Sequence, residues 1–449
     1  MKFFGTDGIR GRFNTEPMTV ETALRVGQAV AALFTTPSKH TVIIGRDTRQ
    51  SGQALTSALA SGVMSMGANV ALAGVIPTPA VAFLTASEET VAVGVVISAS
   101  HNPFEDNGIK LFNETGFKFN NAVEEKIETL MEDAEALAAH RDSVTGSGTM
   151  HHLSQAADRY LQFLKEACPV SLAGLRLVAD ASNGASSALV EALLKGAGAD
   201  LTLINAAPNG VNINAGCGSE HPGQVQSLVL SKGAHAGLAF DGDADRLICV
   251  DEQGEVVSGD QVIAIVAGYY KAKGLLTKDT VVTTVMSNMG LSACLAEQNI
   301  CHIKSAVGDR HVMLAMKEKG AVVGGEDSGH MIFLDRHTTG DGLLSALLLL
   351  TVLVETQKPL SELKQAMTVF PQELINVNVS EKKPLESLTK VTQAIQDAEK
   401  ALNGKGRTLV RYSGTQKMLR VMVEGEDAEL TRGCAEKIAD AVRSEIGEK

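Results

Sequence analysis

The sequence predicts an α/β protein with three related α/β domains in series and a smaller C-terminal α+β domain. Its length of 449 residues suits about three or four domains of ordinary size. Short aliphatic runs alternate with helix-length amphipathic stretches, which is the pattern of parallel α/β units. Near the C-terminus the pattern changes, because strand-like runs there lie close together around a helix.

A strand–helix–strand unit is repeated along the chain. The first copy begins with TVIIG at 41–45, continues through a helix at 51–67 and returns as NVALAG at 69–74. The second begins with RLVAD at 176–180 and returns as DLTLIN, and the third begins with VVTTV at 281–285 and returns as CHIKSAV. Each copy starts with a buried strand and turns through a polar loop into a helix, as repeated domains do.

The C-terminal stretch has a different order of elements. LINVNVS, RTLVRYS and MLRVMVE surround a helix near 384–402 and precede a final helix at 426–446, which predicts an α+β domain. Interruptions in the periodic pattern mark the domain boundaries. The expected domains are residues 1–148, 149–252, 253–368 and 369–449.

Composition and charge argue against several classes of protein. No apolar run reaches the ~18 residues of a membrane span. Asp7 and Arg10 interrupt the segment where a signal peptide would be apolar, so the cytoplasm is the expected location. The net charge is −12 without any Lys/Arg-rich run, which argues against nucleic-acid and membrane partners. The six cysteines form no C-x-x-C pair, so neither a disulfide framework nor a zinc site is predicted.

The run DGDADR at 241–246 crowds three carboxylates into one turn between the strand-like runs GLAF and LICVD. Like charges this close need a cation, and oxygen ligands favour a hard ion such as Mg²⁺. An EF-hand calcium loop competes with this interpretation, although Arg246 stands where that loop requires Gly and the flanks are strand-like. A haloacid-dehalogenase-type phosphatase also competes, although its pattern wants Thr or Val at Asp245, and so does a plain acidic turn in solvent.

The run ISASHNP at 97–103 follows VAVGVV, a strand that is apolar on both faces. Such a strand delivers its loop to the carboxyl edge of the sheet, where ligands of α/β proteins bind. A hydrolase using Ser100 and His101 is disfavoured, because neighbours in sequence seldom face each other and the G-x-S-x-G elbow is absent. A structural Ser/Asn/Pro turn is the alternative.

The run FGTDGIRG at 4–11 is a glycine-punctuated loop. Its backbone N–H groups and Arg10 can hold an anion. It neither follows a strand nor fits G-x-G-x-x-G, so no dinucleotide site is predicted.

The run GGEDSGH at 324–330 joins strand AVVGG to strand HMIFLD. We expect Glu326, Ser328 and His330 to alternate along an extended face that suits sugar hydroxyls. A tight hairpin with a satisfied His330 is the alternative.

The run RYSGTQKMLR at 411–420 lies between two predicted strands. Arginines, a lysine, hydroxyls and a glycine there allow bidentate and backbone contacts to phosphate. A charged hairpin tip at the surface is the alternative.

These five loops resemble, in content and order, the α-D-phosphohexomutase superfamily, and in detail its glucosamine branch. The similarity rests on FGTDGIRG, SASHNP, DGDADR, the GE-x-SGH pattern and R-x-SGT with RVMVE, and it spans almost the whole chain. It implies four domains around a central cleft. It also implies a mutase that interconverts glucosamine 6-phosphate and glucosamine 1-phosphate through a phosphoserine enzyme and a 1,6-bisphosphate.

The resemblance makes Ser100 the phosphorylated serine. It also implies that Mg²⁺ is bound by the phosphoryl oxygen on Ser100 together with Asp241, Asp243 and Asp245. The metal would offset the charge of the carboxylates and polarise the phosphorus for attack by a sugar hydroxyl.

Other positions match residues near the phosphoryl group. Lys110 matches a position implicated in acid/base catalysis, and His101 and His330 are further candidates for that role. Arg10 and Arg246 would supply positive charge near the phosphoryl group.

Substrate binding is assigned by the resemblance to two further groups of residues. Glu326 and Ser328 would bind sugar hydroxyls, and Asp309, next to Arg310, would face the sugar amine. The loop for the nonreacting phosphate would contain Arg411, Ser413, Gly414, Thr415 and Arg420.

The phosphate loop departs from the superfamily at one point. Gln416 and Lys417 stand where Glu-Pro is common, so a negative charge and a rigid ring are lost. We expect a more cationic and more mobile loop, in which Lys417 contributes a phosphate contact.

Two alternative functions stay open at this point. One is a calcium-responsive binding protein built on the acidic turn, and the other is the same mutase chemistry on mannose or glucose phosphates. A monomer or homodimer that binds a small hexosamine phosphate is expected.

Overall fold

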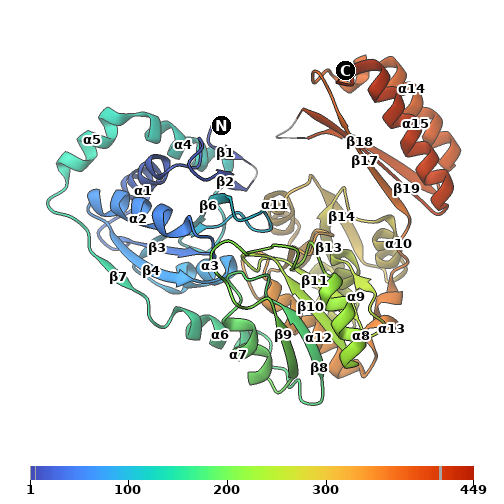
Figure 1. The fold of residues 1–449 in the computed structure, drawn as a ribbon, viewed down its shortest axis with the longest axis horizontal. Helices are drawn as coiled ribbons and strands as arrows, with labels where there is room; N and C mark the ends of the chain where they lie inside the picture. The colour runs from blue at the N-terminus through green and yellow to red at the C-terminus, as the bar shows by residue number, and fades with distance from the viewer. Residues whose placement is uncertain (1, 6, 414–416, 449) are drawn as a thin grey trace. The chain divides into compact units, whose positions relative to one another are not determined.

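The computed structural model describes residues 2–5, 7–413 and 417–448 of the chain (Figure 1). These residues form two compact units. The larger unit contains the residues up to Met286 together with Asn299–Ala366, and the smaller contains Ser287–Gln298 and the residues from Met367 onward.

The first sheet belongs to the larger unit. Its strands are β1 (Phe4–Gly5), β2 (Gly8–Arg12), β3 (Thr41–Arg46), β4 (Asn69–Val75), β5 (Val91–Ile97), β6 (Asp106–Asn113) and β7 (Met150–His152), in the spatial order β1-β2-β6-β5-β3-β4-β7. The helices of this region are α1 (Val20–Phe34), α2 (Gly52–Ser65), α3 (Thr78–Ser87), α4 (Asn121–Glu132) and α5 (Ala134–Ser143).

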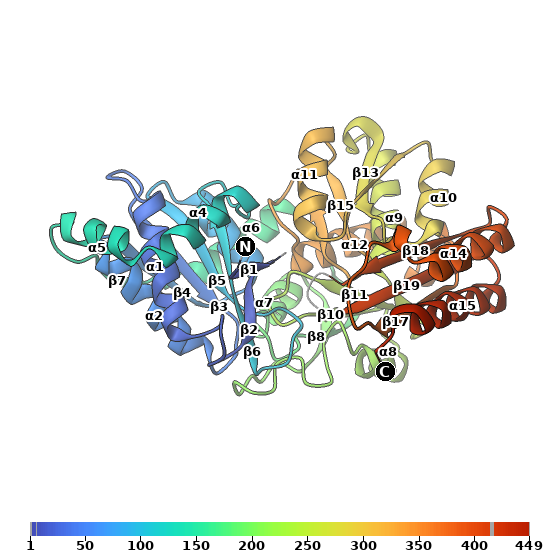
Figure 2. The ribbon, with the colours of Figure 1, turned by 90° about the horizontal axis from the view of Figure 1, so that it is seen from above.

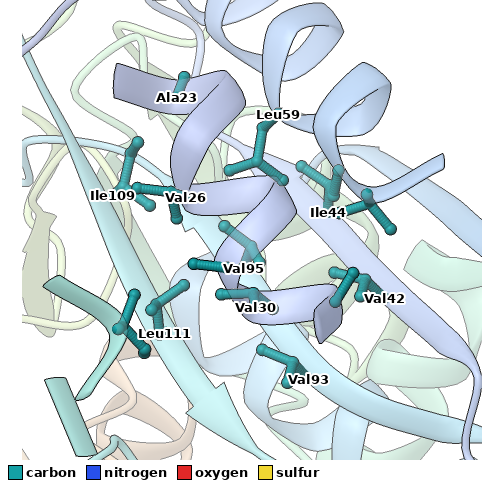
Figure 3. Packing of buried hydrophobic residues seen from close by; sticks show 14 of the residues in the cluster. Ala23, Val26, Val30, Val42, Ile44, Leu59, Val93, Val95, Ile109 and Leu111 are labelled. Carbon is teal, nitrogen blue, oxygen red and sulfur yellow. The ribbon is translucent and has the colours of Figure 1, made fainter. Parts of the chain in front are cut away.

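Helix α1 buries an apolar stripe against the first sheet. Val26 and Val30 lie four residues apart and therefore share one face of the helix, which points at Val95 of β5 (Figure 3). Leu59 of α2 packs into the same cluster, and all four side chains are 0% exposed. Burying each such side chain stabilises the fold by about 1.5–3 kcal/mol. This core holds the strands whose ends carry the polar loops.

The second and third sheets follow in the same unit. The second contains β8 (Arg176–Asp180), β9 (Asp200–Ile204), β10 (Ala236–Phe240), β11 (Leu247–Asp251) and β12 (Val256–Val257), with helices α6 (Ala156–Ala167), α7 (Leu189–Gly196) and α8 (Gly223–Lys232). The third contains β13 (Thr280–Thr284), β14 (Cys301–Ser305), β15 (Val323–Gly325) and β16 (Met331–Phe333), with helices α9 (Gly259–Ala272), α11 (Asp309–Lys319), α12 (Gly342–Thr356) and α13 (Leu360–Leu363).

A common core is present in these three sheets. In each, one strand pairs in parallel with two neighbours, and a fourth strand pairs antiparallel with one of them. The spatial orders are β4-β3-β5-β6, β9-β8-β10-β11 and β14-β13-β15-β16. The prediction of three related α/β domains is confirmed. The runs LICVD and HMIFLD were predicted as strands, but the shared antiparallel pairing of the fourth strand was not, because strand–helix alternation reports only the parallel part of each unit.

The sheets extend slightly beyond the expected domain limits. Strand β7 at 150–152 pairs with β4 of the first sheet, and β12 at 256–257 pairs with β11 of the second. Helix α10 (Met289–Glu297) groups with the smaller unit although it follows β13 in the sequence.

The smaller unit contains the fourth sheet, an antiparallel one. Its strands are β17 (Gln372–Asn378), β18 (Gly406–Tyr412) and β19 (Met418–Gly425) in the order β17-β19-β18. Helices α14 (Thr389–Leu402) and α15 (Ala428–Ile446) lie side by side in both views (Figures 1 and 2). Val421 of β19 and Ile438 of α15 are buried in their shared core. The predicted smaller α+β domain is therefore confirmed.

No single helix of the described residues is long and apolar enough to cross a membrane, and one bent pair, Gly342–Thr356 with Leu360–Ala366, meets that test by length and composition only.

Candidate active site

Ser100 lies just beyond the carboxyl end of β5, a strand whose seven residues are all buried. The serine is 1% exposed and has a φ of 52°, a conformation uncommon for a non-glycine residue. Its Oγ donates a hydrogen bond of 2.5 Å to Oδ2 of Asp241. The loop after β5 thus brings a hydroxyl directly to the acidic turn of the second sheet.

The acidic turn connects β10 and β11, which pair antiparallel. Ala244 takes a φ of 56° in it, and Asp241, Asp243 and Asp245 each offer an oxygen within 4.8 Å of the others. These carboxylates are at most 3% exposed. Since both flanks are strands, the EF-hand alternative and the calcium-responsive protein built on it are excluded.

Two carboxylate oxygens of this cluster accept no hydrogen bond from the described residues. Among the described residues, Oδ1 of Asp243 and Oδ1 of Asp245 are buried and accept no hydrogen bond. A buried unsatisfied carboxylate oxygen is costly unless something else binds it. Three carboxylates that offer only oxygen ligands fit a hard divalent cation, so the residues present suit a metal site.

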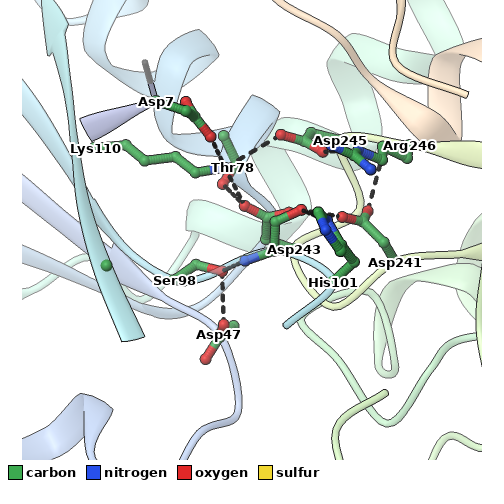
Figure 4. A network of polar contacts seen from close by, with 12 residues as sticks. Asp7, Asp47, Thr78, Ser98, His101, Lys110, Asp241, Asp243, Asp245 and Arg246 are labelled. Atoms are coloured by element: carbon green, nitrogen blue, oxygen red, sulfur yellow. Dashed lines mark hydrogen bonds and ion pairs between the residues drawn. The ribbon is translucent and has the colours of Figure 1, made fainter. Parts of the chain in front are cut away.

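Lys110 of β6 supplies positive charge to the same cluster. It is 1% exposed, and its Nζ lies 2.7 Å from Oδ2 of Asp243, 3.2 Å from Oδ2 of Asp245 and 3.4 Å from Oδ2 of Asp7 (Figure 4). The hydroxyl of Thr78 also donates to Asp243, at 2.6 Å. One ammonium therefore lies within 3.4 Å of three carboxylates.

The carboxylates of the turn titrate differently because their neighbours differ. Burial, together with the charges of Asp245 and Asp243, raises the pKa of Asp241 well above its usual range. Burial would also raise the pKa of Asp245, but the positive charges of Lys110, His330 and Arg246 outweigh it and lower that pKa. A bound cation would favour the ionised form of Asp241.

The two histidines predicted near the phosphoryl group have pKa values shifted in opposite directions. The Nδ1 atom of His101 lies 3.4 Å from Oγ of Ser100, and burial together with Arg246 lowers the pKa of His101 to about 4. His330 has Nδ1 3.6 Å from Oδ1 of Asp245, and this carboxylate and Asp309 raise its pKa against the effect of burial. His101 is therefore neutral at pH 7.

The two arginines predicted there also approach the cluster. The backbone N–H of Arg246 donates to Oδ1 of Asp241 at 3.1 Å, and its side-chain Nε lies 3.9 Å from Oδ1 of Asp245. Arg10 lies in β2, which forms a hairpin with β1, and its guanidinium donates to Asp7. The first motif is therefore a hairpin rather than the loop expected from its glycines.

The motif predicted to bind sugar hydroxyls forms a turn between antiparallel strands β15 and β16. Oε1 of Glu326 accepts from the backbone N–H of Gly308 at 3.0 Å, and Ser328 is half-buried. The expected extended face is wrong for residues 326–330, because the N–H of Gly329 donates to the carbonyl of Glu326 and closes a turn. His330 directly precedes β16 and is buried, 4% exposed.

Asp309 and Arg310 begin helix α11, and each has a charged partner. Lys118 donates to Oδ2 of Asp309 and also to Asp7, so one half-buried ammonium joins two carboxylates. The guanidinium of Arg310 contacts Glu124 of α4 through two hydrogen bonds, of 2.6 and 2.9 Å. Lys118 was missed at the sequence level because nothing in its local pattern distinguishes it from a solvated lysine.

The predicted phosphate loop lies in the smaller unit. Arg411 of β18 and Arg420 of β19 are directly opposite in the ladder, and Ser413 is 3% exposed. Burial and the charge of Arg420 lower the pKa of Arg411. Gly414, Thr415 and Gln416 lie outside the described residues. Lys417 is exposed.

The comparisons with known proteins cover the whole chain. Family models described as phosphoglucomutase/phosphomannomutase α/β/α domains I, II and III match residues 1–138, 158–254 and 258–370, and the model of the C-terminal domain matches 374–441. A phosphoglucosamine mutase of Syntrophobacter fumaroxidans is 49% identical over 447 residues and covers 99% of both chains. One of Desulforapulum autotrophicum is 50% identical over 457 residues and covers 98% of this chain and 99% of its own.

Solved structures show the same fold. A phosphoglucomutase/phosphomannomutase family protein of Burkholderia thailandensis has a TM-score of 0.83 at 24% identity and covers 99% of this chain and 97% of its own. An Aspergillus fumigatus N-acetylphosphoglucosamine mutase, solved with GlcNAc-6P and magnesium, has a TM-score of 0.66 at 18% identity and covers 98% and 95%. With curated relatives this similar over their full length, the chain belongs to the phosphoglucomutase/phosphomannomutase family, within its phosphoglucosamine mutase branch.

Proposed function

We propose that the chain is a mutase that interconverts glucosamine 6-phosphate and glucosamine 1-phosphate through a phosphoserine at Ser100. One observation carries the proposal: a buried serine hydroxyl bonds to one of three clustered aspartates at the edge of the sheet. The curated relatives bear the name of this activity over their full length. Cytoplasmic location, as a monomer or homodimer without nucleic-acid partners, completes the proposal.

The divalent cation is proposed to be Mg²⁺, bound by Asp241, Asp243, Asp245 and the phosphoryl oxygen on Ser100. When bound, it neutralises charge on the transferred group and makes the phosphorus more electrophilic. The oxygen-only donors support a hard ion. Magnesium is also named in the solved complex of the Aspergillus fumigatus enzyme.

The reaction is a pair of phosphoryl transfers. In the first, a free sugar hydroxyl attacks the phosphorus, the bond between phosphorus and Oγ of Ser100 breaks, and a 1,6-bisphosphate forms. The proton of the attacking hydroxyl passes to a base, and Oγ of Ser100 takes up a proton as its bond to phosphorus breaks. After the sugar turns over, the other phosphate returns to Ser100, so net composition is unchanged.

Ionisable neighbours of Ser100 are proposed to accept and donate these protons. His101 can accept a proton because its pKa of about 4 leaves it neutral at pH 7. Lys110, held as an ammonium by three carboxylates, can donate to the leaving oxygen. His330 is a further acid/base candidate, and Arg10 and Arg246 would balance charge on the transferred group.

The remaining residues are proposed to bind substrate. Glu326 and Ser328 would contact sugar hydroxyls, and Asp309 with Arg310 would line the side that meets the amine. The nonreacting phosphate would be held by Arg411, Ser413, Gly414, Thr415 and Arg420. The four domains would comprise residues 1–148, 149–252, 253–368 and 369–449.

The proposal is tested by assaying the purified chain with Mg²⁺ on the 6-phosphates of glucosamine, glucose and mannose. We expect kcat/KM to be highest for glucosamine 6-phosphate and Ser100→Ala to lack turnover. Full activity of Ser100→Ala would end the assignment, and preference for another sugar would change the substrate. Asp309→Asn should erode the preference if the amine is bound there.

A further inference from the structure

Arg49 is a completely buried arginine that no role so far described uses. It follows β3 by three residues, is 0% exposed and is among the largest fully buried side chains. Its Nε donates to Oδ2 of Asp47 at 2.8 Å, and its backbone N–H donates to Oδ1 of the same residue at 2.9 Å. Because Asp47 binds only the backbone N–H and Nε of Arg49, the two terminal nitrogens of the guanidinium are available to another segment.

That segment is the loop that carries Ser100. One terminal nitrogen of Arg49 donates to the carbonyls of Ser100 and Asn102, at 2.9 and 2.8 Å. The other donates to the carbonyl of Pro103 and, at 3.0 Å, to that of Asp106. One guanidinium therefore holds four main-chain carbonyls spread over the loop between β5 and β6.

The hydrogen-bonding capacity of Arg49 is fully used in this way. A guanidinium has five N–H donors, and Arg49 makes five hydrogen bonds to one carboxylate oxygen and four carbonyls. With no free donor and no exposed surface, the side chain cannot reach a substrate phosphate. A direct ligand role is thereby excluded, and its effect must pass through the loop.

The backbone N–H of Ser100 is held by Asp47, the partner of Arg49, through the hydroxyl of Ser98. Asp47 accepts a hydrogen bond of 2.6 Å from Oγ of Ser98. Oγ of Ser98 in turn accepts from the backbone N–H of Ser100 at 2.9 Å. The relay of Asp47 and Ser98 holds the amide of Ser100, while Arg49 holds its carbonyl.

The carbonyl of Ser100 is also contacted by residues from the region of the second sheet. The side-chain amide of Asn214 donates to the carbonyl oxygens of Ser100, at 2.8 Å, and Asn102, at 3.0 Å. A Cβ on Gly242, within the acidic turn, would lie 2.6 Å from the oxygen of Ser100. Arg49 and Asn214 thus use both lone pairs of this carbonyl, and only glycine fits beside it.

The strained backbone of Ser100 needs such support. A non-glycine residue with positive φ costs about 1–3 kcal/mol and persists only where the surroundings over-determine it. The hydrogen bonds to the N–H and carbonyl of Ser100 hold it at its φ of 52°. Phosphoryl transfer depends on positioning, and a shift of about 1 Å can cost about 100-fold in rate.

We infer that Arg49, with Asp47 and Asn214, is a positioning residue that holds the Ser100 main chain so that the phosphoserine stays on the aspartate cluster in both transfers. The inference rests on the proposed function of Ser100. It predicts that loosening the loop slows chemistry without weakening substrate binding, because none of the three residues is proposed to contact the sugar phosphate.

The test compares Arg49→Lys with a matched control, Arg46→Lys. Lysine keeps the charge but has three donors and cannot span four carbonyls. Arg46 ends β3 and is half-buried, and among the described residues its side chain donates only to the carbonyl of Asp47. We expect Arg49→Lys to lower kcat by about 100-fold with KM within about threefold, and the control to match the wild type.

Rapid-quench measurement separates positioning from folding. The phosphorylated enzyme is mixed with glucosamine 6-phosphate, and loss of the Ser100 phosphoryl group is followed in the soluble, folded fraction. We expect Arg49→Lys to slow this single transfer by about the same 100-fold. A lower melting temperature with an unchanged transfer rate would mean a purely structural role and would overturn the inference.

A milder variant covers the case in which Arg49→Lys does not fold. Asn214→Ala removes two neutral hydrogen bonds and should lower kcat by about tenfold with KM unchanged. A wild-type kcat in Asn214→Ala would then contradict the inference. If the wild type itself carries no phosphoserine and has no turnover, the proposed function fails instead, so the two failures are distinguishable.

Discussion

The acidic turn of the larger unit and the paired arginines of the smaller unit both crowd like charges, but they are compensated differently. In the turn, Lys110 lies within 3.2 Å of two aspartates, so part of the negative charge is balanced inside the protein. Arg411 and Arg420 face each other across a ladder, and within the described residues neither forms an ion pair. The first arrangement suits a small cation, and the second suits an anion, in agreement with the phosphate proposed to bind there.

This difference predicts how each region responds to the loss of a charge. Removing one charge from the acidic turn should leave buried partners uncompensated, because its groups are almost inaccessible to water. Removing one arginine from the pair should relieve repulsion, because both arginines are only half-buried. Loss of a charge in the acidic turn should therefore lower both stability and the rate of catalysis. Loss of Arg411 or Arg420 should weaken substrate binding alone.

The largest effect is expected for Asp243→Asn, which removes a charge from the aspartate cluster. We expect kcat/KM to fall by at least about 10³-fold, since a catalytic metal contributes several kcal/mol to transition-state stabilisation. Calorimetric titration with Mg²⁺ should show weaker binding. Asp200→Asn, at an exposed position of β9, is the control. Unchanged Mg²⁺ affinity in Asp243→Asn would contradict the metal assignment.

Lys110→Met tests the internal compensation of the acidic turn. Without Mg²⁺ we expect a loss of about 3–5 kcal/mol in stability, because two buried carboxylates lose their cation. Thermal melting with and without Mg²⁺ measures this, and Mg²⁺ should raise the melting temperature more in the variant than in the wild type. Lys195→Met, which breaks an exposed pair with Glu191, should change little. Equal destabilisation with and without Mg²⁺ would show that the lysine and the metal do not share the charge.

Asp341→Asn tests how stability depends on pH at a buried carboxyl group that has no cationic partner among the described residues. Burial raises the pKa of Asp341 to about 7, although Tyr160 and the N–H of Leu344 donate to it. His337 lies 4.0 Å away, but burial lowers its pKa to about 4, so it is neutral at pH 7.

The sign of the Asp341 effect follows from proton linkage. The unfolded chain loses the Asp341 proton near pH 4, whereas the folded chain keeps it to about pH 7. Stability contributed by this group therefore falls by up to about 4 kcal/mol as pH rises through that window. The variant should lack this decline in its melting temperature and should keep the helix cap, since Asn also caps helices. Parallel pH profiles of variant and wild type would refute the assignment.

The smallest effect is expected for Arg411→Met in the smaller unit. KM for glucosamine 6-phosphate should rise by about tenfold, as expected for loss of a charged hydrogen bond, while kcat changes little. The melting temperature should stay the same or rise slightly, because repulsion with Arg420 is relieved. Arg443→Met on the exposed face of α15 serves as the control. A lower melting temperature with an unchanged KM would make Arg411 a structural residue.

Sequence reasoning predicted the fold well where local pattern determines it. The buried strand VAVGVV and the paired runs around DGDADR formed strands β5, β10 and β11, because apolar content and turn residues are local signals. The three aspartates were found because an acidic run stands between two strands, whereas Ser100 was singled out by the family resemblance of its loop. The structure brings the four side chains together.

Contacts between distant segments were not predictable in this way. Arg49 meets Ser100 across 51 residues and Lys118 meets Asp309 across 191, and no local pattern reports such distances. GRDTR after TVIIG looks like an ordinary charged turn, yet Arg49 is completely buried. Which charges become buried partners depends on how the domains pack, which one sequence does not reveal.

The most direct measurement of the central claim is peptide mass spectrometry of the purified chain before and after exposure to glucosamine 6-phosphate. The account predicts a phosphoryl group on the peptide that contains Ser100, and its transfer to the sugar to give the 1,6-bisphosphate. An unmodified Ser100 in an enzyme that turns over normally, or a phosphoryl group on another residue, would contradict it.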